Sequence, residues 1–310
     1  MATVSDLANV KSCAASDLKG TGNKHKAFKM GVVRKAVLSK RGFDYNGITD
    51  FTQANIAVEV QKGNVIPTKK LFNFEPQNES NVYETSQIGV NSLARKGLYN
   101  YKLTWTGDDQ LQEVMSSYDS EDEYDIAFID ENGTWKLAKN GTEWNGAAVG
   151  IWDTEPYVNP DGSNSGKVSV MVQLNDPIDL NENAQYIDHE KLAFNMTKQE
   201  GINDITLKMT SYAASATTIS FTAYLKDGCT EFTSGTSSDF RLTINGTVTA
   251  ISGGVSISKT GATYTISGLT ALAADDVIKL STYDSTTSTV AIIKDSTDVY
   301  SGKEISVTVA

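Results

Sequence analysis

The chain has 310 residues, which suffices for one large domain or two domains of ordinary size. Hydrophobic residues make up 39% of it, enough for a core, and Ser, Thr, Asn and Gly are abundant, as in β-rich proteins with many turns. Its formal net charge of −11 argues against a protein that wraps nucleic acid, because phosphates repel an acidic surface.

The N-terminal segment, residues 1–30, is polar, and we expect an extended arm with little structure of its own. Residues 1–41 hold nine Lys and Arg against two Asp, a local net charge of +7. A basic arm of this kind either binds nucleic acid or docks on an acidic surface of a neighbouring copy. Docking is the favoured interpretation, because the rest of the chain is acidic.

Residues 31–200 are predicted to form a first β domain with one short helix. Alternating, β-branched and aromatic residues predict its strands, and Asn-Gly pairs predict two tight hairpin turns. The strands are expected at residues 31–40, 55–61, 98–107, 125–130, 135–139, 147–158 and 166–175, and residues 69–91 are expected to form a strand edge followed by a long loop.

Between two of these strands the hydrophobic period changes to that of a helix. Apolar residues at i, i+3, i+4 and i+7 predict a short helix over residues 108–118. Asp108 or Asp109 would cap its first turn, where the helix dipole favours acidic side chains. The apolar positions are Leu111, Val114, Met115 and Tyr118.

Beyond residue 204 the composition shifts to Thr, Ser and Val. Short alternating strands follow at even spacing to residue 310, with turn signals between them, which is the pattern of an immunoglobulin-like β-sandwich. Residues 263–281 resemble the strand-turn-strand of fibronectin-like or bacterial immunoglobulin-like modules, although the Cys–Trp–Cys hallmark is absent. We therefore expect a second domain over residues 204–310.

The two cysteines, Cys13 and Cys229, lie far apart and imply neither a disulfide framework nor a zinc site. The first residues lack the apolar core that a signal peptide needs, and no apolar run reaches membrane-spanning length. We therefore expect a soluble protein that stays in the cytoplasm unless cell lysis releases it.

Residues 117–135 pack seven acids into one stretch with no Lys or Arg. An EF-hand loop that began at Asp119 would have Tyr124 where a glycine is required, so a solvated negative loop is the simpler interpretation. The acids are Asp119, Glu121, Asp122, Glu123, Asp125, Asp130 and Glu131.

A second stretch, residues 179–190, fits a calcium loop better. It offers oxygen ligands at loop positions 1, 3, 5 and 12, but Ala184 replaces the glycine and a strand, not a helix, precedes it. We therefore expect a linker turn without an ion. The four weak metal-ligand candidates are Asp179, Asn181, Asn183 and Glu190.

The sequence offers little to support catalysis, and we expect no enzyme and no cofactor. The only histidines, His25 and His189, lie in the expected arm and near the domain boundary, which argues against a Ser–His–Asp triad because a triad needs a firmly held histidine. Nucleotide-binding and metalloprotease motifs are absent, while general acid–base pairs stay open because a fold can bring any two carboxylates together. Four tryptophans are clustered in the sequence: Trp105, Trp135, Trp144 and Trp152. They either line a platform for a sugar or a nucleobase or belong to the hydrophobic core, and we favour the core.

The two-part layout resembles that of the major tail (tail tube) proteins of tailed bacteriophages. The resemblance rests on strand, helix and strand in "LYNYKLTWTGDDQLQEVMSSYDSEDEYDIAFID" (residues 98–130), the long loop at 74–92, the N-terminal arm, and an immunoglobulin-like domain without a secretion signal. It implies a β-sandwich with a flanking helix, whose strands close an inner barrel in a ring of six copies. The arm and loop would reach adjacent subunits or rings, and the second domain would lie outside the tube.

The resemblance also implies the function. The chain would be a virion structural protein that assembles in the host bacterial cytoplasm into stacked, hexameric rings, the phage tail tube that conducts DNA during ejection. Its partners would be further copies of itself and other tail proteins, such as the tape measure, terminator and baseplate or tip proteins. DNA would pass without specific binding, and no membrane would be involved.

Within this hypothesis, the acidic stretch either lines the tube and repels DNA or receives the basic arm of the next ring. We favour docking, of Lys24, Lys26, Lys29, Arg34 and Lys35 on Asp119, Glu121, Asp122, Glu123 and Asp125. Three alternatives stay open: a head decoration or fibre protein, a carbohydrate-binding protein that uses the tryptophans, and, least favoured, a hydrolase.

Overall fold

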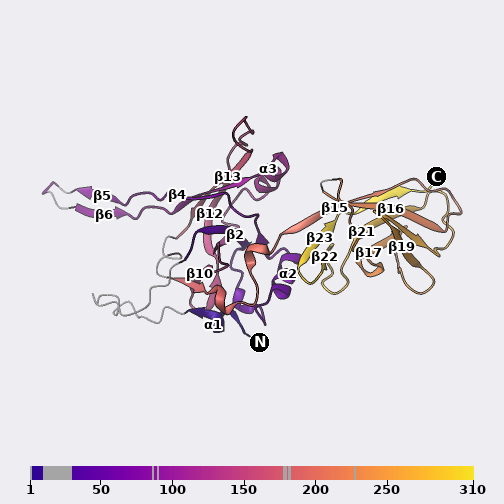
Figure 1. The fold of residues 1–310 in the computed structure, drawn as a ribbon, viewed down its shortest axis with the longest axis horizontal. Helices are drawn as coiled ribbons and strands as arrows, with labels where there is room; N and C mark the ends of the chain where they lie inside the picture. The colour runs from indigo at the N-terminus through magenta and orange to yellow at the C-terminus, as the bar shows by residue number, and fades with distance from the viewer. Residues whose placement is uncertain are drawn as a thin grey trace. The chain divides into compact units, whose positions relative to one another are not determined.

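The computed structural model describes residues 2–9, 30–85, 87–88, 91–176, 180, 183–226 and 228–310. The fold is mainly β, as predicted, with several sheets (Figure 1). The chain divides into two compact units, a first unit of Met1–Ile56 and Asn64–Gln199 and a second unit of Ala57–Gly63 and Glu200–Ala310. Among the described residues, no helix combines the length and apolarity needed to cross a bilayer.

The first residues of the chain are structured. Helix α1 (Val4–Leu7) is followed by strand β1 (Ala8–Asn9), which pairs with β14 (Ala184–Ile187), and Val4 is fully buried. The prediction of an unstructured arm is therefore wrong for residues 2–9. Residues 10–29 lie outside the described part of the chain, and so do Lys24, Lys26 and Lys29.

The first unit is built on one curled sheet whose two halves share strand β12 (Ala147–Thr154). The register of β12 shifts between Val149 and Ile151, so its first half pairs with β9 and its second half with β13. Directly before β12, Gly146 lies so close to β9 that an added Cβ would be 2.6 Å from the Ile126 nitrogen. The half that pairs with the start of β12 contains β2 (Val33–Lys40), β3 (Val65–Pro67), β9 (Tyr124–Asp130), β10 (Trp135–Asn140), β11 (Glu143–Asn145), β1 and β14. The half that pairs with the end of β12 contains β4 (Asn73–Pro76), β7 (Asn100–Thr106), β8 (Ser120–Glu121) and β13 (Lys167–Leu174).

The core of the first unit lies between these two halves. Period-2 alternation along β13 buries Val168, Val170 and Val172, as expected of a strand with one apolar face. Helix α3 (Asp109–Ser116) adds Leu111 and Met115 to the same core, with the Asp108 side chain accepting the Leu111 N–H at 3.0 Å. The predicted helix and its cap are confirmed.

A second apolar layer covers the other face of β10. The Trp135 ring meets Tyr45 and Phe51 edge-on, with centroids 5.7 and 5.4 Å away. Asp44 begins the short turn η2 (Tyr45–Gly47) and accepts the Trp144 N–H at 2.9 Å, which ties this layer to β11. Further 3₁₀ turns of the chain are η3 (His189–Lys191), η4 (Met196–Lys198) and η5 (Ser237–Asp239).

The strand predicted at residues 55–61 is wrong, because this segment is helix α2 (Gln53–Gln61). Its alternating Ile56, Val58 and Val60 imitate a strand, yet Ile56, Ala57 and Val60 are the buried apolar positions, which is helical spacing. Thr52 begins the helix, since its hydroxyl accepts the Asn55 N–H at 3.4 Å.

The second unit is a two-layered β-sandwich. Side chains of both layers form one core, in which Phe221 from one sheet packs against Phe240 from the other with ring centroids 5.0 Å apart. The six-stranded sheet has β15 (Ile202–Met209), β16 (Thr218–Leu225), β19 (Ser256–Thr260), β20 (Thr263–Ser267), β22 (Ala291–Lys294) and β23 (Asp298–Gly302), and the four-stranded sheet has β17 (Phe240–Ile244), β18 (Thr247–Thr249), β21 (Val277–Thr282) and β24 (Ile305–Thr308).

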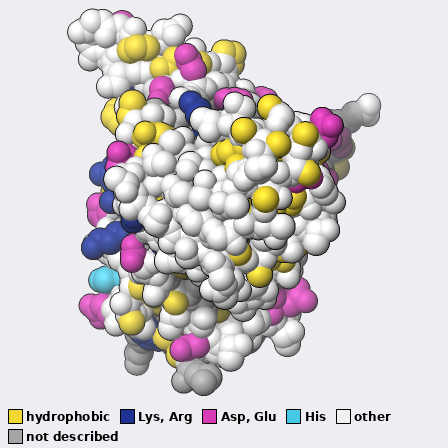
Figure 2. Space-filling model, turned by 90° about the vertical axis from the view of Figure 1, so that its right-hand side faces the viewer, with side chains coloured by type: hydrophobic (Ala, Val, Ile, Leu, Met, Phe, Trp, Pro, Cys, Tyr) yellow, Lys and Arg dark blue, Asp and Glu magenta, His cyan; other side chains and the backbone are white. Residues whose placement is uncertain are grey.

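Two of these strands, β18 and β23, were not expected from the sequence, and β23 pairs with β15 in parallel. The other pairs of the second unit are antiparallel. On the face drawn in Figure 2, neutral polar side chains and backbone predominate and most charged side chains lie towards the edges. A surface of this kind is expected from the Thr- and Ser-rich composition beyond residue 204.

Candidate self-assembly site

The segment expected to be a long loop is instead a two-stranded ribbon. It continues the pairing of β4 with β7 through the Gln77 N–H to the Asn100 carbonyl at 2.8 Å and the Glu79 N–H to the Leu98 carbonyl at 3.0 Å. Strands β5 (Val82–Thr85) and β6 (Asn91–Arg95) then pair with each other. We call residues 77–99 the ribbon; in Figure 1 its strands β5 and β6 extend away from the sheet that carries β4.

Local contacts between its two strands set the register of the ribbon. Gly97 faces Glu79 so closely that an added Cβ would lie 2.0 Å from the Glu79 carbonyl oxygen. The Gly97 N–H donates to the Asn81 side chain at 2.8 Å, and the Arg95 guanidinium lies 3.1 Å from the Glu79 carboxylate. These contacts hold the strands together without a core.

The ribbon exposes apolar side chains along its length. Every described residue of β5 and β6 is exposed, and Tyr83 and Leu93, which lie opposite each other, are 59% and 49% exposed. Val82 is 43% exposed, and Ile88 in the turn is 86% exposed. A two-stranded ribbon is at best marginally stable in water, and an exposed apolar surface of this kind marks a contact with another molecule.

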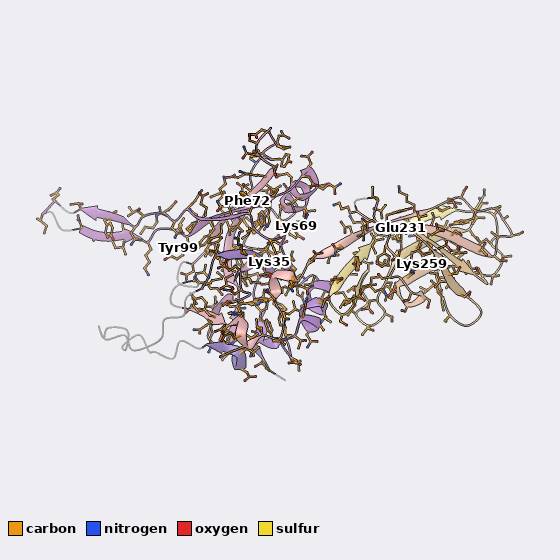
Figure 3. The ribbon with its side chains drawn as sticks, viewed as in Figure 1. Lys35, Lys69, Phe72, Tyr99, Glu231 and Lys259 are labelled. Carbon is orange, nitrogen blue, oxygen red and sulfur yellow. The ribbon has the colours of Figure 1, made fainter. Side chains whose placement is uncertain are left out.

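At its base the ribbon is anchored in the first unit. The Phe74 ring stacks on Tyr101 with centroids 5.2 Å apart, and both pack on Phe128 in the core. Phe72 and Tyr99, which directly precede β4 and β7, are labelled in Figure 3. The anchored base fixes the direction of the ribbon, while none of the described residues of β5 and β6 is buried in this copy.

The acidic stretch is divided between structural and surface roles. Arg41 binds two of its acids, with Nη1 2.9 Å from Asp125 Oδ1 and Nη2 2.9 Å from Asp122 Oδ1. Arg41 Nη2 also donates to the Val149 carbonyl at 2.7 Å, and Asp125 Oδ2 accepts the Gly42 N–H at 2.7 Å. Asp125 is only 3% exposed, so it is a buried structural carboxylate.

Asp130 holds the turn between β9 and β10. Its Oδ1 accepts the N–H groups of Asn132, Gly133 and Thr134 at 2.8–2.9 Å, and its Oδ2 accepts the Gly31 N–H at 2.9 Å. The turn needs a glycine, because Gly133 has φ +99°. A buried carboxylate with four backbone donors stabilises local structure and is not a surface charge.

The remaining acids of the expected docking surface lie at the surface. Asp119 is exposed and accepts the Thr154 N–H at 2.9 Å, while Glu121, Asp122 and Glu123 are exposed. We call residues 121–123 the acidic patch. Asp122 has φ +57°, a conformation that Asp tolerates better than most residues, and its carboxylate also contacts the Asn175 amide.

Two of the expected docking residues are unsuitable for docking. Lys35 is buried, and its ammonium group donates to the backbone carbonyls of Thr197, at 3.5 Å, and Gln199. Asp125 is buried against Arg41, as described above. Each is the first of a run of buried residues in its strand, Lys35 in β2 and Asp125 in β9. Of the expected basic partners within the described chain, Arg34 is exposed.

The metal and aromatic candidates find little support. Asp179 and Asn181 lie outside the described residues, the Asn183 side-chain amide donates to Asn140 Oδ1 at 3.0 Å, and Glu190 is exposed. Within the described ranges, no three His, Cys, Asp or Glu residues are grouped so that they could hold a metal ion. The tryptophan platform is wrong, because all four rings are buried: Trp105, Trp135, Trp144 and Trp152.

Comparisons with known proteins do not identify a family. A scan against protein-family models found no match, and a search of the curated proteins found none. The function is therefore argued from the exposed ribbon and the charged surface beside it.

Proposed function

We propose that this chain is a structural protein of a phage virion, which assembles into stacked rings of six copies to form the tail tube that conducts DNA during ejection. The observation that carries the proposal is the ribbon with its exposed apolar side chains. Assembly would take place in the host bacterial cytoplasm. The further partners would be the tape measure, terminator and baseplate or tip proteins.

The ribbon supports self-assembly for a physical reason. Tyr83, Leu93 and Ile88 together leave much apolar surface in water, and burial of such surface contributes about 25 cal/mol per Å². One copy cannot bury them, because the ribbon stands away from its own core. A contact between the ribbon of one copy and a different surface of the next is heterologous, and such contacts generate rings and open stacks.

The layout supports a tail tube over other assemblies. The first unit combines a curled β-sheet, the flanking helix α3 and a ribbon, and a separate β-sandwich follows it in the chain. We propose that this sandwich is an immunoglobulin-like domain outside the tube. These features support the proposal.

Charge supports the same proposal. A conduit for DNA must not bind phosphate, and the chain carries a net charge of −11. We propose docking of the basic N-terminal segment, with Arg34, on the acidic patch of the next ring. Glu121 and Glu123 are the exposed carboxylates for this contact, while Asp122 is shared with Arg41. Lys35 and Asp125 are not part of it.

The experiment is sedimentation velocity of the wild-type chain and of a variant with Tyr83→Ser and Leu93→Ser. We expect large species for the wild type and monomers for the variant. Val158→Ser and Val248→Ser are the controls, since these residues are 54% and 52% exposed but lie off the ribbon. Assembly that survives the ribbon changes, or fails equally in the controls, would refute the role of the ribbon. A wild type that sediments as a monomer or trimer favours a decoration or fibre protein.

A further inference from the structure

The outer face of the four-stranded sheet in the second unit carries a row of polar and charged side chains. Leu242 and Leu280 point into the core, so their neighbours in sequence point outward. Arg241 pairs with Ser281 across β17 and β21, and Thr243 pairs with Lys279. The strand alternation therefore places two cations and two hydroxyls side by side on this face, where Ser281 is only 6% exposed.

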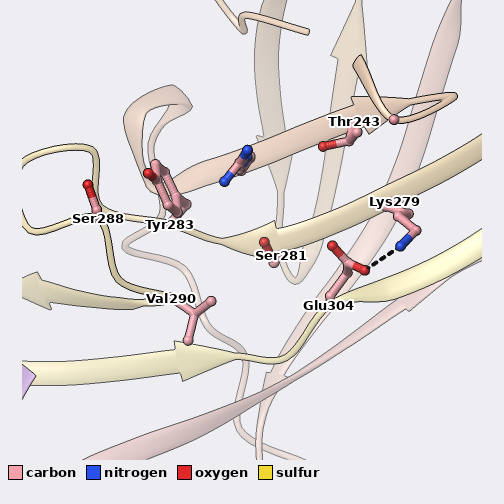
Figure 4. A pocket seen from close by; sticks show the side chains of 9 residues that line it. Thr243, Lys279, Ser281, Tyr283, Ser288, Val290 and Glu304 are labelled. Carbon is pink, nitrogen blue, oxygen red and sulfur yellow. Dashed lines mark hydrogen bonds and ion pairs between the residues drawn. The ribbon is translucent and has the colours of Figure 1, made fainter. Parts of the chain in front are cut away.

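These residues form the floor of a groove of about 460 Å³, a volume in the range of sites for small molecules. Figure 4 shows Ser281 and Lys279 on the same strand, with Tyr283, Ser288 and Val290 towards one end and Glu304 beside Lys279.

The wall made by residues 284–290 is an ordered turn. The Asp284 N–H donates to the Thr289 carbonyl at 2.8 Å, the Asp284 carboxylate accepts the Thr286 N–H at 2.9 Å, and the Thr287 hydroxyl donates to the same carboxylate at 2.9 Å. This wall is thus preformed, and a ligand would not have to order it. Preorganisation of this kind lowers the entropic cost of binding.

The charges in the groove favour an anion. Lys279 is neutralised by Glu304, with Nζ 2.9 Å from Oε1. Arg241 forms no ion pair with any residue in the described part of the chain, and its guanidinium carbon lies 4.9 Å from the Tyr283 ring centroid. Stacking orients the guanidinium and leaves its N–H groups available for a carboxylate or phosphate in the bidentate manner. The groove therefore carries one uncompensated positive charge on an acidic protein.

The rest of the lining favours a hydroxylated ligand. Thr243, Ser281 and Ser288 provide hydroxyl groups, which both donate and accept hydrogen bonds, and Val290 provides an exposed apolar edge. A stacked nucleobase is disfavoured, because Arg241 already covers a face of the Tyr283 ring. A small inorganic anion would contact Arg241 but would leave most of the groove unfilled.

We propose that this groove binds a saccharide that carries an acidic group, with Arg241 holding the acidic group and the hydroxyl residues holding the sugar ring. The groove belongs to the second unit alone, so the inference does not depend on tube assembly. It assigns the second unit a ligand-binding activity beyond a structural role.

The test is isothermal titration calorimetry of the full chain with three probes: a tetrasaccharide of alternating glucuronic acid and N-acetylglucosamine, the neutral N-acetylglucosamine tetrasaccharide, and inorganic phosphate. A sugar phosphate, glucose 6-phosphate, tests whether phosphate replaces carboxylate as the acidic group. We expect binding of the acidic tetrasaccharide or the sugar phosphate, weakened as salt rises, and weaker binding of the neutral sugar and of phosphate.

Variants then test the residues. Arg241→Gln should weaken binding of the acidic saccharide by about tenfold or more, since it removes hydrogen bonds between a charged donor and a charged acceptor. Arg241→Lys keeps the charge, loses the bidentate geometry and should have an intermediate effect, which covers the case in which Arg241→Gln fails to fold.

Lys279→Gln should also weaken binding, because it leaves Glu304 unpaired beside the acidic group. Its matched control is Lys226→Gln, which breaks the Lys226–Asp204 pair elsewhere in the second unit. The side chains of the two pairs are similarly exposed, 44% and 53% against 42% and 48%. Absence of saccharide binding, equal binding of the neutral sugar, equal binding of phosphate, or an Arg241→Gln variant that binds like the wild type would each overturn the proposal.

Discussion

Replacement of Asp125 by Asn tests whether the acidic stretch is partly structural. The change removes one negative charge and keeps the shape of the side chain. In the wild type, Asp125 Oδ1 accepts from Arg41 Nη1 and Oδ2 accepts from the Gly42 N–H, at 2.9 and 2.7 Å. An amide offers one oxygen and one NH₂ group, so one of these two donors would face another donor.

The magnitude follows from burial. Removing one partner of a buried ion pair lowers the free energy of unfolding by about 3–5 kcal/mol, because the remaining charge is left without compensation. Arg41 is 31% exposed and keeps Asp122 and the Val149 carbonyl as partners, so we expect the lower end of this range, about 3 kcal/mol. The matched control is Glu123→Gln, the same chemical change two residues away on an exposed side chain, with an expected effect within about 0.5 kcal/mol.

The assay is urea unfolding followed by tryptophan fluorescence. All four tryptophans, Trp105, Trp135, Trp144 and Trp152, lie in the first unit, so the signal reports its unfolding alone. In a thermal scan the same loss corresponds to about 6–12 °C, from about 2–4 °C per kcal/mol for a domain of this size. An Asp125→Asn variant that unfolds with the wild type, or a Glu123→Gln variant that loses as much stability, would refute the division into structural and surface acids.

Three further predictions follow from other residues. Burial raises the pKa of the Tyr101 phenol to about 12, above its ordinary value of 10.0. The stability that this pKa shift gives the folded state is therefore complete below pH 10 and is lost between pH 10 and 12, by about 1.4 kcal/mol per pH unit. Tyr101→Phe should flatten the pH dependence of urea unfolding in this window, and an unchanged slope would contradict the raised pKa. Gly97→Ala should disturb the ribbon and stop assembly in sedimentation velocity, because the added Cβ would lie 2.0 Å from the Glu79 carbonyl oxygen. The free energy of unfolding detected by tryptophan fluorescence should stay within about 0.5 kcal/mol of the wild type. Normal assembly of this variant would argue against the ribbon as the assembly site. Asp130→Ala should destabilise the first unit by about 3 kcal/mol or more, since it removes the side-chain acceptor of four backbone N–H groups, of which the Gly133 N–H keeps the Asp130 carbonyl at 3.1 Å. Glu131→Ala, next to it and exposed, should not destabilise the unit, as urea unfolding of both variants would show.

Strands with one buried face could be predicted from the sequence. The alternation of Val168, Val170 and Val172 repeats every two residues, because their side of the sheet faces the apolar core. The spacing of Leu111 and Met115 identified α3 in the same way. In both cases the periodicity is visible in the sequence without knowledge of the tertiary structure.

The ribbon and α2 could not be predicted by the same reasoning. The ribbon has no buried face, so nothing constrains its residues to alternate, and Pro76 and the polar residues after it favour a loop. In α2, Ile56, Val58 and Val60 alternate like a strand, and only Thr52 as a cap favours a helix.

The candidate site was predicted in part. The sequence shows that seven acids are close together, but it does not show that Arg41, 81 residues before Asp122, reaches into the cluster. Nor does it show that Lys35 turns inward to the Gln199 carbonyl. Long-range contacts of this kind depend on the tertiary fold, which local pattern does not determine.

Negative-stain electron microscopy of the purified chain, concentrated and at modest salt, tests the central claim most directly. The account predicts tubes or stacked rings of six copies, with the second units outside as knobs. A field of separate monomers under the same conditions would contradict it.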